Sequence, residues 1–140
     1  MKKSAEQVLC YRFENEETLD AIRAVMRKLS IECRVLPEES WREKVGFLLG
    51  MRGFKPAPKD DEEMFAFSDE VMILHRIQGK RLNQVLAALK AAGVPPIRYK
   101  AVATPFNILW TLRRLCETMK KEHAYMTEMA EGAKNDDGEA

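Results

Sequence analysis

The 140-residue chain has no long hydrophobic run, only two histidines and an odd number of cysteines. No apolar run approaches the roughly 18–20 residues that a membrane span needs, so we expect no transmembrane helix. Two N-terminal lysines precede no apolar stretch of about 7–15 residues, so we expect no signal peptide. The three cysteines, Cys10, Cys33 and Cys116, are far apart and form no CxxC pair. This usage predicts reduced thiols and a cytoplasmic protein.

Motifs of the common enzyme classes are also missing. The sequence has no GxGxxG or GxxxxGKS loop, which excludes the usual nucleotide cradles. It has no GxSxG motif and no cluster of Cys, His and Asp that suggests a nucleophile. His75 and His123 lack the spacing of a metal site. The sequence therefore favours a non-catalytic protein without a metal or cofactor.

The net charge of +1 conceals a strong segregation of charge along the chain. Residues 1–75 carry 12 Lys or Arg and 15 Asp or Glu, a net charge of −3. Residues 76–121 carry 10 Lys or Arg and one acid, a net charge of +9, and residues 122–140 have a net charge of −5. Such a basic segment fits an acidic partner, a nucleic acid or the acidic parts of the same protein.

One pattern occurs twice in the chain. A short apolar run, residues 8–11 and again 71–74, precedes an amphipathic helical pattern and then a second short strand near 33–36 and 99–103. A proline and a tryptophan-containing helix follow in each copy, with Pro37 and Trp41 in the first and Pro105 and Trp110 in the second. The sequence thus predicts two β-α-β-α units related by internal duplication.

These units predict an α/β fold with a four-stranded, mostly parallel sheet and helices on both faces. The expected strand order is 2-1-3-4, and a ferredoxin-like α+β sandwich is the alternative fold. Ligands of open α/β sheets bind beyond the carboxyl ends of the strands. We therefore expect a crevice between Arg12–Asn15 and His75–Gly79, in which Glu16 and Glu17 neutralise Lys80 and Arg81.

The composition divides the chain into four segments. We expect the first half at 1–50, a partly exposed linker at 51–70 and the second half at 71–131. The linker contains glycine, proline and the run Lys59-Asp60-Asp61-Glu62-Glu63, and residues 64–67 either form a short strand or pin it to the core. Residues 132–140 are small and acidic, which predicts a disordered tail.

The segment Lys100–Trp110, KAVATPFNILW, predicts the start of a helix after a buried strand. Thr104 suits the N-cap, Pro105 the first helical position, and Asn107 can bond back to the turn. Free backbone N–H groups beside Arg98 and Lys100 suit an anion. The alternative is a framework turn that serves packing alone, in which the Asn107 side chain only locks the turn.

A second basic turn precedes the other helix of this half. Lys80 and Arg81 stand in its first turn, where the helix dipole favours anions, and this placement suits a phosphate or an acidic partner as well as solvated side chains. The expected functional class is a small interaction module, with binding of an anionic ligand or RNA as the alternative. The candidate residues for binding an anion or a partner are Arg76, Lys80, Arg81, Arg98, Lys100, Thr104 and Asn107.

The last helix is expected over about 106–131 and carries a heptad-like apolar seam. Its members are Leu109, Leu112, Cys116, Met119, His123, Met126 and Ala130. The seam continues beyond the reach of one small sheet, so we expect self-association through Met119, His123 and Met126, unless the protein's own core covers it. The expected partners are a second copy or another protein, nucleic acid is possible, and no membrane is expected.

Residues 71–126 also resemble a small bacterial family described only as a domain of unknown function (DUF3783-like). The resemblance is strongest over KAVATPFNILWTLRRLCETMKKEH, in which Thr104, Pro105, Asn107, Trp110, Thr111, Glu122 and His123 match the family pattern. It implies that Pro105, Trp110, Thr111 and His123 belong to a shared framework. The chain departs from the pattern at Gln78-Gly79-Lys80-Arg81. The resemblance implies no activity.

Overall fold

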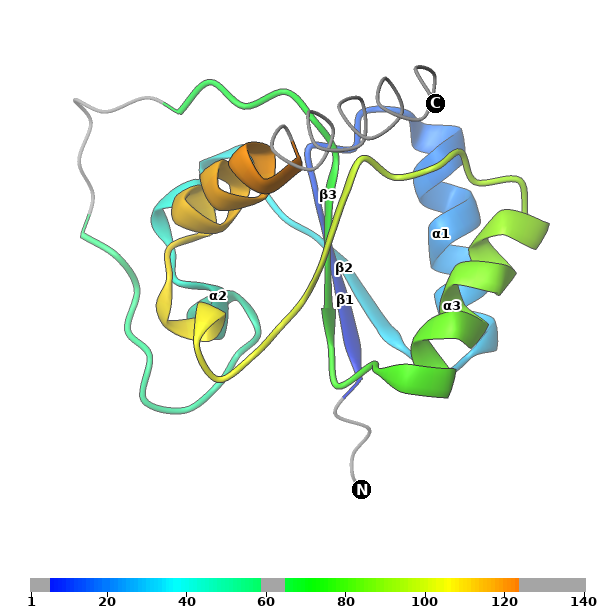
Figure 1. Cartoon of the computed structure of the whole chain (residues 1–140), viewed down its shortest axis with the longest axis horizontal. Coiled ribbons are helices and arrows are strands. Elements are labelled where there is room, and N and C mark those ends of the chain that lie inside the picture. Colours follow the sequence, from blue (N-terminus) through cyan, green and yellow to red (C-terminus); the bar gives the residue numbers. More distant parts are fainter. Residues whose placement is uncertain (1–5, 59–64, 124–140) are drawn as a thin grey trace, which may run out of the picture.

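The computed structural model describes residues 6–58 and 65–123, which form three layers around one sheet. In Figure 1, α1 and α3 cover one face of the sheet, while α2 and a helix over 112–123 cover the other. The strands and helices follow in the order β1 (Gln7–Tyr11), α1 (Glu16–Lys28), β2 (Glu32–Val35), the 3₁₀-helix η1 (Glu38–Arg42), α2 (Val45–Leu48), β3 (Val71–His75), α3 (Gly79–Ala91), β4 (Tyr99–Val102) and the 3₁₀-helix η2 (Asn107–Leu109).

The sheet has the strand order β2-β1-β3-β4, as predicted. Its two outer pairs, β1 with β2 and β3 with β4, are parallel, and the central pair of β1 with β3 is antiparallel. Helices on both faces confirm the α/β prediction over the ferredoxin-like alternative. The antiparallel pair places Gln7 opposite His75 and Tyr11 opposite Val71, so the end of β1 lies beside the start of β3.

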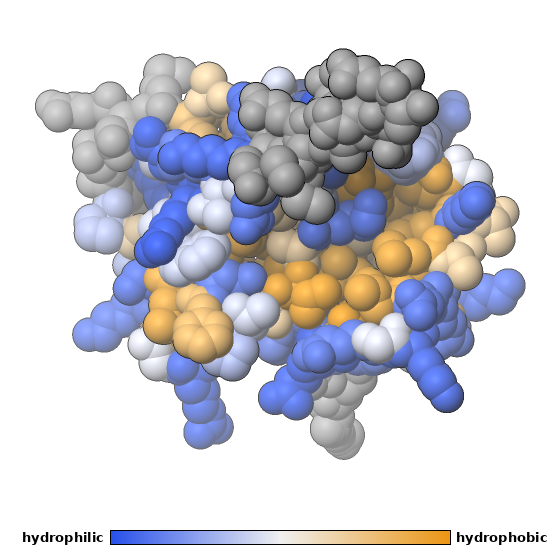
Figure 2. Space-filling view, in the orientation of Figure 1, coloured by the Kyte–Doolittle hydropathy of each residue, from blue (hydrophilic) through white to orange (hydrophobic). Residues whose placement is uncertain are grey.

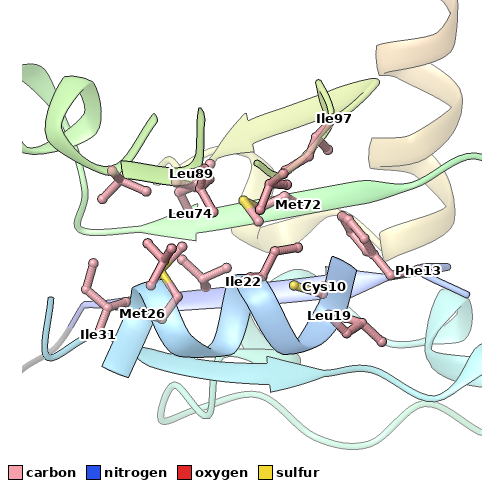
Figure 3. Close-up of a cluster of buried hydrophobic side chains, with 14 of the residues drawn as sticks. Cys10, Phe13, Leu19, Ile22, Met26, Ile31, Met72, Leu74, Leu89 and Ile97 are labelled. Carbon is pink, nitrogen blue, oxygen red and sulfur yellow. The ribbon is translucent and has the colours of Figure 1, made fainter. Parts of the chain in front are cut away.

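The face under α1 and α3 is a closely packed apolar core (Figure 3). The side chain of Ile22 on α1 lies over Cys10 of β1, Met26 lies further along the same helix toward Ile31, and Leu89 of α3 lies over Leu74 of β3. Helix α1 is capped by Asn15, whose side-chain oxygen accepts a hydrogen bond of 2.9 Å from the backbone N–H of Thr18.

The opposite face buries the alternate residues of the same strands. Leu9 and Tyr11 of β1 and Val71 and Ile73 of β3 pack against Trp41, Phe67, Val45, Leu112 and Leu115. Both central strands are thus buried on both faces, which explains their continuous apolar sequence. The hydroxyl group of Tyr11 donates to the backbone carbonyl of Glu38 at 2.7 Å, and burial raises the pKa of this hydroxyl to about 12.

The two halves join a second time outside the sheet. Lys44 and Thr111 form an antiparallel bridge, in which the N–H of Val45 donates to the carbonyl of Trp110 at 2.9 Å. The N–H of Leu112 donates in return to the carbonyl of Glu43 at 2.8 Å. This reciprocal pair fixes the start of α2 against the start of the helix over 112–123.

Corresponding turns in the two halves have the same unusual backbone. The residue after each central strand, Arg12 or Arg76, has a positive φ of 66° or 61°. The turn after each long helix also has one such residue, Ser30 at 59° and Gly93 at 83°. The order of strands and helices is likewise the same in both halves. Internal duplication of the sequence stays a prediction.

Two predicted helices are wrong in extent. The tryptophan-containing helix predicted after Pro37 forms only η1 and the short α2, and the continuous helix over 106–131 is interrupted. Trp110 adopts an extended conformation with φ −86° and ψ 151°, so η2 ends before a new helix begins at 112. The bridge with Lys44 requires this extended backbone and overrides the local helical pattern.

The linker between the halves is pinned to the core at its second end. Phe67 is buried, and Phe65 stacks on it with a distance of 5.4 Å between ring centroids. No strand forms in residues 51–58 or 65–70, the described parts of this linker. Residues 59–64 and the predicted disordered tail over 132–140 lie outside the described residues.

We expect the two halves to unfold together, because the central strand pair belongs to both. Leu9 lies at the centre of this pair, opposite Ile73, and Leu9→Ala should lower the free energy of unfolding by about 2–5 kcal/mol. The exposed Leu109→Ala serves as the control and should change it far less. Chemical denaturation of Trp41→Phe and Trp110→Phe, in which the remaining tryptophan reports on one half, should give coincident transitions. Separate transitions would contradict this expectation.

Candidate functional site

The predicted crevice between Arg12–Asn15 and His75–Gly79 is wrong. Because β1 and β3 are antiparallel, these two turns lie at opposite ends of the sheet. The partner of Arg81 is therefore not Glu16 or Glu17 but Glu6, whose carboxylate oxygens accept from its Nε and Nη2 atoms at 2.8 and 2.9 Å. Nη2 of Arg81 also donates to the carbonyl of Leu29 at 2.6 Å. Arg81 is thus used within the fold.

The turn after β4 is a closed framework of hydrogen bonds. The Asn107 Oδ1 atom accepts from the N–H of Thr104 at 2.8 Å, and the Thr104 hydroxyl accepts from the N–H of Asn107 at 3.0 Å. Asn107 Nδ2 donates to the carbonyl of Val102 at 3.1 Å, and the N–H of Phe106 donates to the Thr104 hydroxyl at 3.2 Å. This reciprocal capping box occupies the groups that were candidates for an anion.

The remaining predicted cations do not converge. Arg76 and Lys80 are exposed beyond the carboxyl end of β3. Arg98 and Lys100 stand at the start of β4, which is parallel to β3, so they lie at the opposite end of the strands. Nζ of Lys100 donates to the carbonyl of Ile97 at 3.0 Å and lines a separate apolar cavity of about 390 Å³. His75 lies beside Arg76, and burial, with a smaller effect of this cation, lowers its pKa.

The seam of the last helix is used largely within the protein's own core. Leu112 and Cys116 are buried, and Met119 packs against the same cluster. The ring of His123 meets the ring of Tyr99 edge-on, with 5.6 Å between centroids. Leu109 belongs to η2 instead of this helix, which corrects the start of the seam, and Met126 and Ala130 lie outside the described residues. Self-association through Met119, His123 and Met126 stays a prediction.

Positive charge gathers around a cavity that lies where the two halves meet. This cavity of about 650 Å³, here called the junction pocket, contains the bridge residues Lys44 and Thr111 in its wall. Leu109 and residues 52–58 complete the wall. Four cationic residues line it, and no carboxylate belongs to its described lining: the cations are Arg42, Lys44, Arg52 and Lys55.

Packing beneath the linker holds this wall in place. The ring of Phe54 lies on Gly46, where an added Cβ atom would meet its Cζ atom at 2.3 Å. The carboxylate of Glu43 accepts a hydrogen bond of 2.7 Å from the N–H of Ala57. The guanidinium of Arg42 stands 4.9 Å from the centroid of the Trp41 ring. A side chain at position 46 would displace the ring of Phe54 from the wall.

The sequence does not reveal this pocket through its net charge, because the long segment that contains the four cations, residues 1–75, has a net charge of −3. Over residues 1–75 the 15 acids outnumber the 12 cations, although Glu38 is engaged with Arg12. The signal that was present is the alternation Arg42-Glu43-Lys44, with extended backbone at Glu43 and Lys44. Side chains two residues apart on extended backbone point to the same side. The acidic run at 60–63 lies outside the described residues.

The cysteines offer a different chemistry. All three are free, and Cys10 and Cys33 lie on the neighbouring strands β1 and β2. Hydrogen bonding between their thiols raises the pKa of Cys10, which burial raises further, and lowers the pKa of Cys33. Arg23 contributes to the lowering at Cys33. Burial raises the pKa of Cys116 to about 12.

Two other features are absent from residues 6–58 and 65–123. No group of three or more His, Cys, Asp or Glu side chains there is arranged to hold a metal ion. No helix in this part of the chain has both the length and the apolar character needed to cross a membrane.

Asn107→Ala should lower the free energy of unfolding by about 1–3 kcal/mol, because it leaves the N–H of Thr104 and the carbonyl of Val102 without their partner. Asn83→Ala is the matched control, since Asn83 is exposed on α3. Thermal and urea denaturation followed by circular dichroism measure both variants. An Asn107→Ala protein as stable as the parent would contradict the framework assignment.

Cys33 should react with iodoacetamide faster than the other two cysteines near pH 8. Its lowered pKa gives it a larger thiolate fraction, and its side chain is only half-buried, whereas Cys10 and Cys116 are buried with raised pKa values. Peptide mapping by mass spectrometry at short reaction times identifies the modified cysteine. Cys33→Ser should remove the fast phase, and equal labelling of Cys116 in the native protein would overturn this ranking.

Comparison with known proteins adds one match. No curated protein and no solved structure matches the chain. Residues 70–126, from the residue before β3 through the helix over 112–123, match the model of a family described as Domain of unknown function (DUF3783). This segment includes the Thr104–Asn107 turn and excludes Arg42, Lys44, Arg52 and Lys55. The second half of the chain therefore carries a domain of unknown function of the DUF3783 family, as its resemblance predicts.

Proposed function

We propose that this protein is a small, non-catalytic, cytoplasmic interaction module that binds an anionic ligand at the junction pocket. The observation that carries the proposal is the set of four cationic residues around one cavity, without a carboxylate in its described lining. Like charges repel one another, and the Glu43 carboxylate that is held against Ala57 balances only part of this charge, so a bound anion would stabilise the folded protein. The proposal moves the expected anion site from the second half to the junction.

Geometry favours this pocket over the basic residues of the second half. Arg81 is paired with Glu6, and the guanidinium of Arg98 lies 4.0 Å from the carboxylate of Asp69. Lys100 lies at the opposite end of the strands from Lys80. In the junction pocket, by contrast, Arg42 and Lys44 stand in a wall whose backbone is held by the bridge to Thr111. Because this backbone is already ordered, binding of an anion needs to order only the side chains.

The cytoplasmic part of the proposal depends on thiol chemistry. Cys10 and Cys116 are buried and free, and Cys33 is half-buried and free. A half-buried thiol with a lowered pKa is easily oxidised in an oxidising compartment. Free thiols of this kind are typical of proteins in a reducing compartment.

Titration of the full chain with inorganic pyrophosphate tests the binding site. The double variant Arg42→Gln/Lys44→Gln removes two cations of the pocket. The matched control, Arg98→Gln/Lys100→Gln, removes two cations at the start of β4, outside the pocket. We expect the pocket variant to weaken binding about tenfold or more, because each lost charge-assisted contact contributes about 1 kcal/mol or more. Isothermal titration calorimetry at low ionic strength measures the affinity.

Binding that is unchanged in the pocket variant, or weakened only in the control variant, would contradict the proposed site. Absence of pyrophosphate binding by the parent at millimolar concentration would contradict it as well. Circular dichroism of each variant ensures that a loss of binding is compared between folded proteins.

A further inference from the structure

We infer that the ligand of the junction pocket is a single-stranded nucleic acid, whose phosphates contact the four cations and one of whose bases stacks on Phe106. This inference rests on the proposed function and deepens it. Its carrying observation is independent of charge: an aromatic ring stands almost free of the protein beside a cationic cavity.

Phe106 lies next to the pocket through the geometry of η2. Its side chain is 76% exposed, and that of Leu109, which lines the pocket, is 59% exposed. The N–H of Leu109 donates to the carbonyl of Phe106 at 3.2 Å, and residues three apart in a 3₁₀-helix lie on the same side. Figure 2 shows this hydrophobic surface at the lower left, over the turn that Figure 1 colours yellow, with hydrophilic side chains around it.

The hydrogen bonds and packing of the turn fix the backbone of Phe106, so its ring is exposed on an ordered turn. Asn107, immediately after Phe106, is buried and bonded to both Thr104 and Val102. Ile108 on the other side packs against the core. A rigid turn that buries its neighbours and leaves one phenylalanine in water suits a stacking platform.

The pocket itself accommodates more than one charged group. Its volume of about 650 Å³ is in the range of cavities that hold whole small molecules, well beyond a lone phosphate. Apolar residues lie between and beside its cations along the chain, since Phe54, Pro56 and Pro58 flank Arg52 and Lys55. A nucleotide chain likewise alternates anionic phosphates with flat bases, and bases stack on aromatic rings with little sequence preference.

An acidic peptide and a duplex fit these features less well. An acidic peptide would pair with the cations, but it does not carry in each residue a flat group that could stack on the ring of Phe106. In a duplex the bases are already stacked on one another, so a protruding ring meets only the backbone. A single strand offers both its phosphates and its unstacked bases.

Fluorescence anisotropy with fluorescein-labelled 12-mers tests the inference on the full chain. The probes are oligo(U) and oligo(dT), which distinguish RNA from DNA, and the competitor is poly-glutamate. The variants are Phe106→Ala, the pocket pair Arg42→Gln/Lys44→Gln and the control pair Arg98→Gln/Lys100→Gln. Phe106 is exposed, so its replacement should leave the fold intact, which circular dichroism checks.

We expect a single strand to bind the parent, with affinity reduced about tenfold in Phe106→Ala, as loss of one base–aromatic stack implies. The pocket pair should reduce affinity at least as much and lower the magnitude of the log–log salt slope by about 1.4, or about 0.7 for each lost phosphate contact. The control pair should change neither quantity appreciably.

The other outcomes separate the two proposals. Pyrophosphate binding at the pocket without oligonucleotide binding would overturn this inference and leave the proposed function standing. Oligonucleotide binding that is indifferent to Phe106→Ala and displaced equally by poly-glutamate would show a general polyanion site and overturn the stacking role. Binding that only the control pair weakens would overturn both proposals.

Discussion

The antiparallel pairing of β1 with β3 is the constraint on which the remaining architecture depends. Residues 8–11 and 71–74 are buried on both faces, so neither strand has a solvent-facing side that would tolerate a slip in register. With Leu9 opposite Ile73, the two half-sheets are joined about a common centre. This register decides which loops meet at each edge, and it brings α2 to the start of the helix over 112–123, where the bridge of Lys44 with Thr111 closes the second junction.

The bridge places two residues of each half in the wall of the same cavity, but the side chains of the two halves differ in chemistry. Arg42 and Lys44 of the first half and Leu109 and Thr111 of the second stand two residues apart in each case and line the same cavity. The first pair contributes charge, and the second contributes an apolar group and a hydroxyl. The linker adds the outer wall, since Phe54 fits over the bare backbone of Gly46. The pocket therefore draws on both halves and on their connection.

Local sequence patterns predicted the layers and the strand order because burial dictates them. The apolar runs at 8–11 and 71–74 identify the central strands, and the amphipathic spacing after each run identifies α1 and α3. The capping role of Asn107 was also readable, since a Thr-x-x-Asn spacing allows the reciprocal bonds that are found. These features depend on neighbours within a few residues, for which sequence spacing is a reliable guide.

The sequence did not predict whether the two central strands, β1 and β3, are parallel or antiparallel. Parallel and antiparallel pairing bury the same residues of β1 and β3, so the apolar pattern is equal for both, and the expected crevice at 12–15 and 75–79 depended on the wrong choice. The break at Trp110 was hidden for a similar reason, because it is imposed by Lys44, 66 residues earlier in the chain. The junction pocket needs both of these long-range facts.

The place of the pocket wall has a consequence for how function passes between related proteins. Every one of the four cations belongs to residues 42–55, outside the segment 70–126 that the family shares. A relative that has only the shared segment has no counterpart of that charge. A function inferred by alignment over the shared segment therefore does not extend to the cationic wall of the junction pocket, which needs a chain that also carries this first half.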